Sequence, residues 1–345
     1  MKRLLFGIIF ALLILNPTHT PQAMVKGVCS DCHTMHNSQM GGEMAYDFSG
    51  TTFSKTATPK PTLLIYSCVG CHTRAGTDNS TIDGGVPIVF NVADPLKPLA
   101  GGNFHYLIAD GQGNASGHNV LGIKDPAAPL GSTPPGGTTL DEQLRCAGKY
   151  GCHGDKDKTD QLEAMKTAHH TNDTGGITAT SVGLSYRFLL GVKGAELNDD
   201  GYKWEQNADS THHNGYYGVS AYNDSNTISY LCGKCHGNFH AHTALGGSTQ
   251  VGTGSPWLRH PTDKLLSGGE YDNYTTYNVL VPPALDTPST STDNITGKAI
   301  VMCLSCHRAH ASPYYKMIRW NYKDWPGTIE PAGSKGCGTC HTSKN

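Results

Sequence analysis

Six pairs of cysteines, each followed directly by a histidine, are the residues of this 345-residue chain best suited to chemistry. Two thiols can bond to the two vinyl groups of one haem, and a histidine beside the second thiol then reaches the iron from one face. The arrangement C-x-x-C-H is therefore typical of covalent c-type haem attachment. It uses all twelve cysteines: CSDCH at 29–33, CVGCH at 68–72, CAGKYGCH at 146–153, CGKCH at 232–236, CLSCH at 303–307 and CGTCH at 337–341.

These motifs, numbered one to six in chain order, predict six haem c groups with defined ligands. Zinc ribbons also use paired cysteines but do not need a histidine after every pair, and disulfides do not need one at all. The predicted proximal iron ligands are His33, His72, His153, His236, His307 and His341. The predicted thioether residues are Cys29, Cys32, Cys68, Cys71, Cys146, Cys152, Cys232, Cys235, Cys303, Cys306, Cys337 and Cys340.

Motif three departs from this spacing, since five residues separate Cys146 from Cys152. The loop between the two anchor points must bulge, and Gly148 and Gly151 make a bulge sterically easy. Two alternatives remain open here: attachment through Cys152 alone, or a small disulfide with no haem. His153 stands where a proximal ligand belongs, so we predict six haems, with five as the fallback.

The N-terminus has the pattern of a secretory signal. Lys2 and Arg3 precede an apolar run at 4–15, and a short polar stretch ends at Ala23. Twelve apolar residues are too few to span a bilayer. We expect a signal peptide at 1–23, a single cytochrome domain at 24–345 with no transmembrane anchor, and secretion through the periplasm to the cell outer surface or beyond.

The composition predicts an unusual interior. Only 37% of residues are hydrophobic, while glycine reaches 42 and proline 19. Six porphyrins would supply the missing apolar surface, so we expect mostly irregular loop, with short helices and little sheet, wrapped around a chain of six haems. A formal charge of −2 gives no basic patch for nucleic acid. Three arginines are candidates to pair with haem propionates or to lie solvated on the surface: Arg259, Arg308 and Arg319.

The sixth ligand of each iron separates an electron carrier from an enzyme. Of 18 histidines, six are proximal and His19 lies in the expected signal peptide, which leaves eleven. That surplus permits two histidines on every iron, which suits outer-sphere electron transfer. Methionine is a weaker candidate, with Met35 and Met40 nearest a motif.

Three of these histidines follow a proximal one by three or four residues: His36, His240 and His310. On a helical turn each would share a face with its neighbour, so it should ligate a different iron. Asp160 and Glu163 resemble a capping box that opens a helix, whose apolar stripe favours His169 over His170 as an inward ligand.

Several strings resemble the filament-forming, outer-surface hexahaem cytochromes of metal-reducing bacteria. They run in order along the chain: CHTMHNSQ at 32–39, SCVGCHTRAG at 67–76, GHNV at 117–120, CHGNFH at 235–240, LRHP at 258–261, CLSCHRAHAS at 303–312 and the last CGTCH. The resemblance implies bis-histidine haem c throughout, alternately stacked and perpendicular haem pairs, and conductive extracellular filaments. The distal ligands that it implies are His36, which would ligate a haem of the adjacent subunit, His118, His240, His260 and His310.

The family pattern at motif three has a histidine two residues after the motif, where this chain has Gly154 and Asp155. The missing distal ligand should be His169 or His170, with His213 in reserve. We expect surface or structural roles for the remaining histidines of interest, His105, His212 and His242.

Together these features predict a non-enzymatic electron carrier. Motifs near both chain ends favour a head-to-tail homopolymer, since a contact of that kind that does not close forms an open fibre. Its partners would be electron donors and external acceptors such as metal oxides. A monomeric periplasmic or outer-surface shuttle fits the motifs equally well. A multihaem reductase would need an open iron, often marked by lysine in place of the motif histidine, and all six motifs keep histidine.

Overall fold

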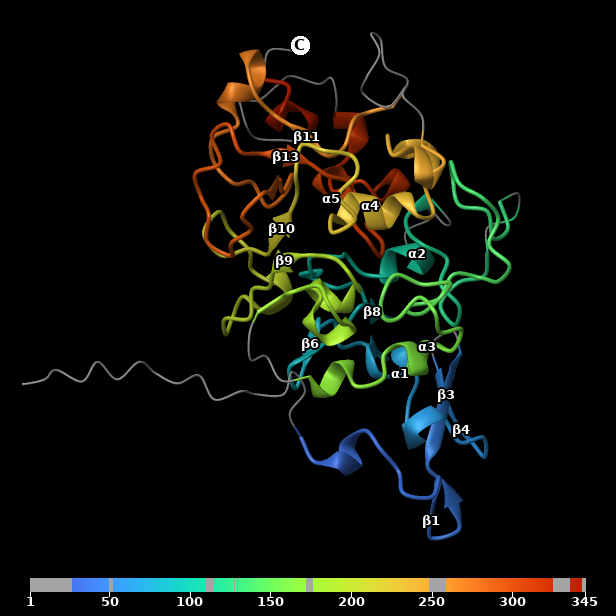
Figure 1. Cartoon of the computed structure of the whole chain (residues 1–345). Helices are drawn as coiled ribbons and strands as arrows, with labels where there is room; N and C mark the ends of the chain where they lie inside the picture. Colours follow the sequence, from blue (N-terminus) through green and yellow to red (C-terminus); the bar gives the residue numbers. More distant parts are fainter. Residues whose placement is uncertain are drawn as a thin grey trace, which may run out of the picture.

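The structure is a computed structural model that describes residues 27–49, 52–109, 115–126, 128, 130–171, 176–247, 259–324 and 336–342. The expected signal peptide at 1–23 lies outside the described residues. The chain progresses along the long axis of the molecule (Figure 1). Its first described segment, with β1, β3 and β4, projects at one end, and α5, β11 and β13 lie toward the other.

The described helices are all short, and two of the α-helices begin at the first cysteine of a motif. Helix α1 and helix α5 are the x-x loops of motifs two and five themselves, and α4 contains the first cysteine of motif four. A single helical turn suffices, because residues three apart lie on the same face. The α-helices are α1 (Cys68–Cys71), α2 (His105–Ala109), α3 (Gln161–Ala164), α4 (Ile228–Gly233) and α5 (Cys303–Cys306).

Short 3-10 turns supply the remaining helical structure, including those at motifs one and six. They are η1 (Cys29–Asp31), η2 (Pro61–Leu63), η4 (Ala168–His170), η5 (Val182–Leu184), η6 (Tyr186–Phe188), η7 (Lys203–Glu205), η8 (Gly237–Phe239), η9 (Thr243–Leu245), η10 (Gly269–Asn273), η11 (Tyr315–Met317), η12 (Tyr322–Asp324) and η13 (Gly336–Thr339).

The largest sheet has five strands in the order β11-β13-β12-β10-β9, in which only β10 and β12 are parallel. Three antiparallel hairpins (β1-β2, β3-β4 and β6-β7) and one parallel pair (β5-β8) complete the strands. The strands are β1 (Ser38–Gln39), β2 (Gly42–Glu43), β3 (Ala45–Ser49), β4 (Thr52–Thr56), β5 (Thr73–Arg74), β6 (Ile82–Asp83), β7 (Val86–Pro87), β8 (Phe90–Asn91), β9 (Gly194–Ala195), β10 (Gly215–Tyr217), β11 (Lys264–Leu265), β12 (Ala284–Leu285) and β13 (Ile300–Val301).

The apolar interior of the polypeptide is divided into small clusters. One surrounds Tyr216 and Met302, another Phe90 and Leu107, and a third Tyr277. None of the described helices is long and apolar enough to cross a membrane. The predicted fold class, loops with short helices and little sheet, is confirmed.

Candidate haem centres

Five of the six motif histidines have the same hydrogen bond to the backbone. In each, Nδ1–H donates to a carbonyl oxygen at 2.8–2.9 Å, which leaves Nε2 as the nitrogen available to a metal. The acceptors lie between 9 and 101 residues away along the chain: Thr62 for His33, Pro87 for His72, Arg187 for His153, Pro135 for His236 and Lys316 for His307. Motif three, despite its wide spacing, therefore holds its histidine as the others do.

Five motif histidines also face a second imidazole at nearly constant separation. Two imidazoles that bind one metal from opposite faces, with bonds of about 2.0–2.1 Å, have ring centroids about 6.4 Å apart. The observed pairs are His33 with His170 (6.1 Å between centroids, planes 23° apart), His72 with His169 (6.3 Å, 28°), His118 with His236 (6.1 Å, 41°), His153 with His310 (6.4 Å, 45°) and His260 with His341 (6.2 Å, 84°). Each pair combines one motif histidine with one other, as bis-histidine haem requires.

The structure differs from the sequence-based expectation at two of the distal positions. We expected one of His169 and His170 to be a ligand, and the structure places both opposite motif histidines. The capping of α3 by Asp160 is as predicted, since its side chain accepts from the N–H groups of Leu162 and Glu163. However, the helix ends at Ala164, and the two histidines lie on a separate turn, η4, where adjacent side chains diverge toward two motifs.

His240 is the other difference, because it does not face a motif histidine. Its Nε2–H donates to the carboxylate of Asp263 at 2.9 Å, and both side chains are buried. Its Nδ1 accepts the backbone N–H of His242 at 3.1 Å. Both ring nitrogens of His240 thus have hydrogen-bond partners within the chain, and His170 joins the distal candidates.

Motif five and His36 remain without a partner imidazole among the described residues. His307 is held like the other proximal histidines, by Lys316 O at 2.9 Å, but no second imidazole of the described chain is stacked or tilted against it. His36 lies exposed on the projecting N-terminal segment between η1 and β1, beside the 81%-exposed Met35. Met40 is also fully exposed, so neither methionine faces a motif.

The wide motif three forms a compact bulge. Ala147 pairs with His153 in a short parallel bridge, and Gly148 takes a left-handed φ of +82°. The ammonium of Lys156 donates to the carbonyls of Gly151, Cys152 and His153, which neutralises the carbonyl end of the bulge. Gly148 thus takes the backbone conformation that makes the bulge sterically easy, as predicted.

Sulfur atoms of successive motifs are neighbours. Hydrogen bonding with Cys146 raises the pKa of the Cys68 thiol, and burial raises the pKa of Cys71 and Cys306 to about 12, each with a further contribution from a cysteine of an adjoining motif. Hydrogen bonding links Cys68 with Cys146 and Cys232 with Cys303, and charge on one cysteine raises the pKa of the other in the pairs Cys32 with Cys71, Cys152 with Cys235 and Cys306 with Cys340. The motifs are therefore arranged in space in the order of the sequence.

Burial keeps several of these imidazoles neutral, which is the form that binds a metal. It lowers the pKa of His153 and His169 to about 4 and that of His310 to about 3. It also lowers the pKa of His72, His118, His260 and His307.

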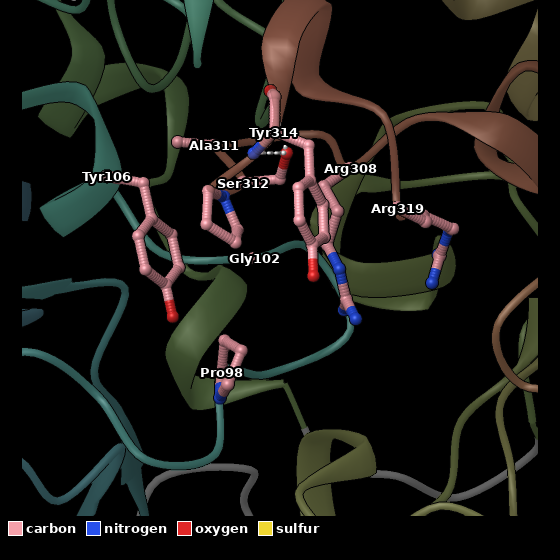
Figure 2. Close-up of a pocket in the computed structure, with 9 residues that line it drawn as sticks. Pro98, Gly102, Tyr106, Arg308, Ala311, Ser312, Tyr314 and Arg319 are labelled. Carbon is pink, nitrogen blue, oxygen red and sulfur yellow. Dashed lines mark hydrogen bonds between the residues drawn. The ribbon is translucent and has the colours of Figure 1, made fainter. Parts of the chain in front are cut away.

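The buried Arg319 and the half-buried Arg308 line a cavity of about 190 Å³ next to motif five. Figure 2 shows Tyr106 and Arg319 at opposite edges of the lining, with Tyr314 and Arg308 side by side between them. Arg308 donates to the carbonyls of Leu99 and Ala100, and Arg319 to that of Leu304.

The charges of these two arginines act on each other. Burial lowers the pKa of Arg308 to about 10, the charge of Arg319 lowers it further, and Glu205 opposes the effect. Nη2 of Arg319, whose side chain is 4% exposed, has no hydrogen-bond partner among the described residues. An unpaired buried donor of this kind is costly, and a carboxylate satisfies it best. The propionate groups of a haem at motif five fit this requirement. Arg259 instead lies over the ring of Phe239, 5.6 Å from its centroid.

The other histidines are engaged in local contacts. His105 binds the carbonyl of Asn91, His212 the carboxylate of Asp209, and His242 accepts the N–H of Ala244. The reserve candidate His213 is buried and stacked on Tyr277 with centroids 3.4 Å apart, so its faces are already packed.

Comparisons with known proteins agree with this arrangement. A family described as a doubled CXXCH motif matches residues 296–345, which hold motifs five and six. The chain is 26% identical to the C-type cytochrome OmcS of Geobacter sulfurreducens over 353 aligned positions, which cover 85% of this chain and 78% of that protein. A structure of the Outer Membrane Cytochrome S filament from this organism matches with a TM-score of 0.52 at 20% identity, covering 87% of this chain and 85% of that one. A cryo-EM structure of OmcS nanowires matches with a TM-score of 0.51 at 22% identity over 86% and 84%. The chain therefore has the fold of a multihaem c-type cytochrome.

Proposed function

We propose that this chain, a multihaem c-type cytochrome similar to OmcS in sequence and fold, carries electrons through six haems and polymerises into extracellular conductive filaments. The observation that carries the proposal is the set of five opposed imidazole pairs with centroids 6.1–6.4 Å apart. Two ligands on one iron account for this separation, and each of the five pairs has a motif histidine on one side.

The haem supplies reversible one-electron exchange between ferric and ferrous iron. The paired cysteines of each motif would hold the haem through thioethers, and the motif histidine together with a second imidazole would bind its iron. Backbone carbonyls hold the proximal rings in one tautomer. A closed iron has no position for substrate, which favours outer-sphere electron transfer over catalysis. We therefore infer that the protein is not an enzyme.

The order of the sulfur contacts supports a continuous path. Because each motif neighbours the next one in the sequence, haems attached there would form one chain from motif one to motif six. Arg308 and Arg319 would hold propionates at motif five and stabilise the negative charge there.

The junction between subunits would be at motif five. His307 has no partner imidazole among the described residues, while His36 is exposed on a projecting segment. His36 of a second copy would be the second ligand of the iron held by His307. The iron held by His307 of that second copy would in turn take His36 from a third copy. Such a contact is heterologous, and it propagates as a fibre when it does not close into a ring. External acceptors, such as metal oxides, would take electrons from the filament.

Electron microscopy of the secreted protein tests this function together with its haem content. We expect filaments, six haems per chain by mass, and low-spin iron that does not bind carbon monoxide when reduced. Monodisperse particles with five closed irons and one open iron would support a shuttle instead. Carbon monoxide binding in intact filaments would support a reductase.

A further inference from the structure

His341 of motif six is held differently from the other motif histidines. Its Nδ1–H points to the carboxylate of Glu270, with Nδ1 3.2 Å from Oε1, whereas the other five donate to backbone carbonyls. The two side chains are only 17% and 11% exposed, so little water competes for this contact.

Local structure holds Glu270 in place. It lies on η10, whose backbone is tied to the end of motif six: the hydroxyl of Thr342 donates to the carbonyl of Glu270 at 2.9 Å. The side chain of Asn273 donates to the same hydroxyl at 3.0 Å. The ring of Tyr271 packs edge-on against His341 with centroids 5.7 Å apart. The carboxylate is thus positioned by the same turn that packs against the motif.

A carboxylate accepts a stronger hydrogen bond from imidazole than a neutral carbonyl does. The proton shifts toward the acceptor, the ring gains imidazolate character, and its Nε2 becomes a better electron donor to the metal. A better donor stabilises ferric iron more than ferrous iron. We propose that Glu270 is a positioning residue that lowers the reduction potential of the haem at motif six relative to the other five.

This inference rests on the proposed function, since it requires a haem between His260 and His341. The same pair provides a spectroscopic label. Its planes are 84° apart, whereas those of the other observed pairs are 23–45° apart. Perpendicular ligands raise the two π-type iron orbitals equally, which leaves orbital angular momentum unquenched and makes the ferric resonance strongly anisotropic. Nearly parallel ligands do not.

The experiment is a redox titration of the holoprotein at neutral pH, followed by electron paramagnetic resonance at this anisotropic signal. Glu270→Gln removes the charge with little change of shape. Asp272→Asn is the matched control, because Asp272 lies on the same turn but binds the N–H of Gly268 instead of His341. Haem count by mass and the low-spin absorption spectrum verify that each variant is loaded, and Glu270→Asp, which keeps the charge, provides a second variant.

We expect the signal of Glu270→Gln to disappear at a higher potential than that of the wild type. The shift should be about tenfold in the ratio of oxidised to reduced haem, which is about 59 mV for a one-electron couple. Asp272→Asn should titrate like the wild type and Glu270→Asp close to it. An unchanged midpoint potential in Glu270→Gln, or an equal shift in Asp272→Asn, would overturn the role of Glu270 and leave the proposed function intact. Absence of any anisotropic signal in the wild type would overturn the ligand pair and the inference with it.

Discussion

The centre at motif three and the centre at motif five are built alike on one side and differently on the other. His153 and His307 both donate to a backbone carbonyl, at 2.8 Å and 2.9 Å. His153 faces His310 of its own chain, 6.4 Å away between centroids, while His307 faces no imidazole of the described chain. The wide spacing of motif three therefore does not disturb its pair of imidazoles, and motif five, with ordinary spacing, is the one for which we propose a ligand from a second copy.

His36→Ala should have the largest effect on this contrast. Without a donated imidazole at motif five, we expect complete loss of filaments under the electron microscope, with six haems still attached and one iron open to carbon monoxide. His212→Ala, which removes a histidine bonded to Asp209 away from the motifs, should leave filaments unchanged. Filaments of normal length from His36→Ala would contradict the assignment.

Replacing distal histidines tests the interior centres. His170→Ala should convert one haem of six to a high-spin form that binds carbon monoxide, because His33 then has no opposite ligand. His240→Ala should leave every haem low-spin, although loss of its buried bond to Asp263 destabilises the fold by about 1–3 kcal/mol. The reverse result would restore His240 as the ligand and remove His170. Visible absorption with carbon monoxide titration measures both.

The wide motif can be tested through its first cysteine. If both thiols are bonded, Cys146→Ala leaves a haem with one thioether and one unsaturated vinyl group, which shifts the alkaline pyridine absorption band of one haem of six to longer wavelength. The matched change at an ordinary motif, Cys68→Ala, should give the same shift. An unshifted spectrum for Cys146→Ala would mean that the native haem is bound through Cys152 alone.

The smallest expected effect concerns the buried charge at motif five. The positive charge of Arg319 favours the ferrous form of a haem bound at motif five. Arg319→Met removes this charge, so the reduction potential of that haem should fall by about 59 mV, which is a tenfold change in the ratio of oxidised to reduced haem. Arg259→Met, at an arginine stacked on Phe239, serves as the control. Equal potentials in both variants would argue against propionate pairing at Arg319. Spectroelectrochemistry provides the measurement.

Some of this site was predictable from the sequence because it is local. Cysteines and histidine in C-x-x-C-H are fixed by a spacing of a few residues, and low apolar content predicted a fold with little regular structure. The cap at Asp160 was also predicted correctly. The pairing of distal histidines was not predictable, because His33 and His170 meet only through the tertiary fold.

The positions of His170 and His240 differ from the sequence-based expectation for separate physical reasons. Helical periodicity was used to choose between adjacent histidines, but the helix ends at Ala164 and Thr167 takes a left-handed φ of +69°, so the periodicity does not continue. His240 was assigned from resemblance, and nothing near it in the sequence reveals that Asp263 lies against it. In the first case the backbone turn at Thr167 ends the helical pattern, and in the second a long-range contact holds His240.

The most direct test of the account is a structure of the secreted assembly that resolves the ligands of the iron at motif five. The account predicts a filament in which the imidazole opposite His307 is His36 of the adjacent subunit. A ligand from the same chain, or an iron with an open face, would contradict it.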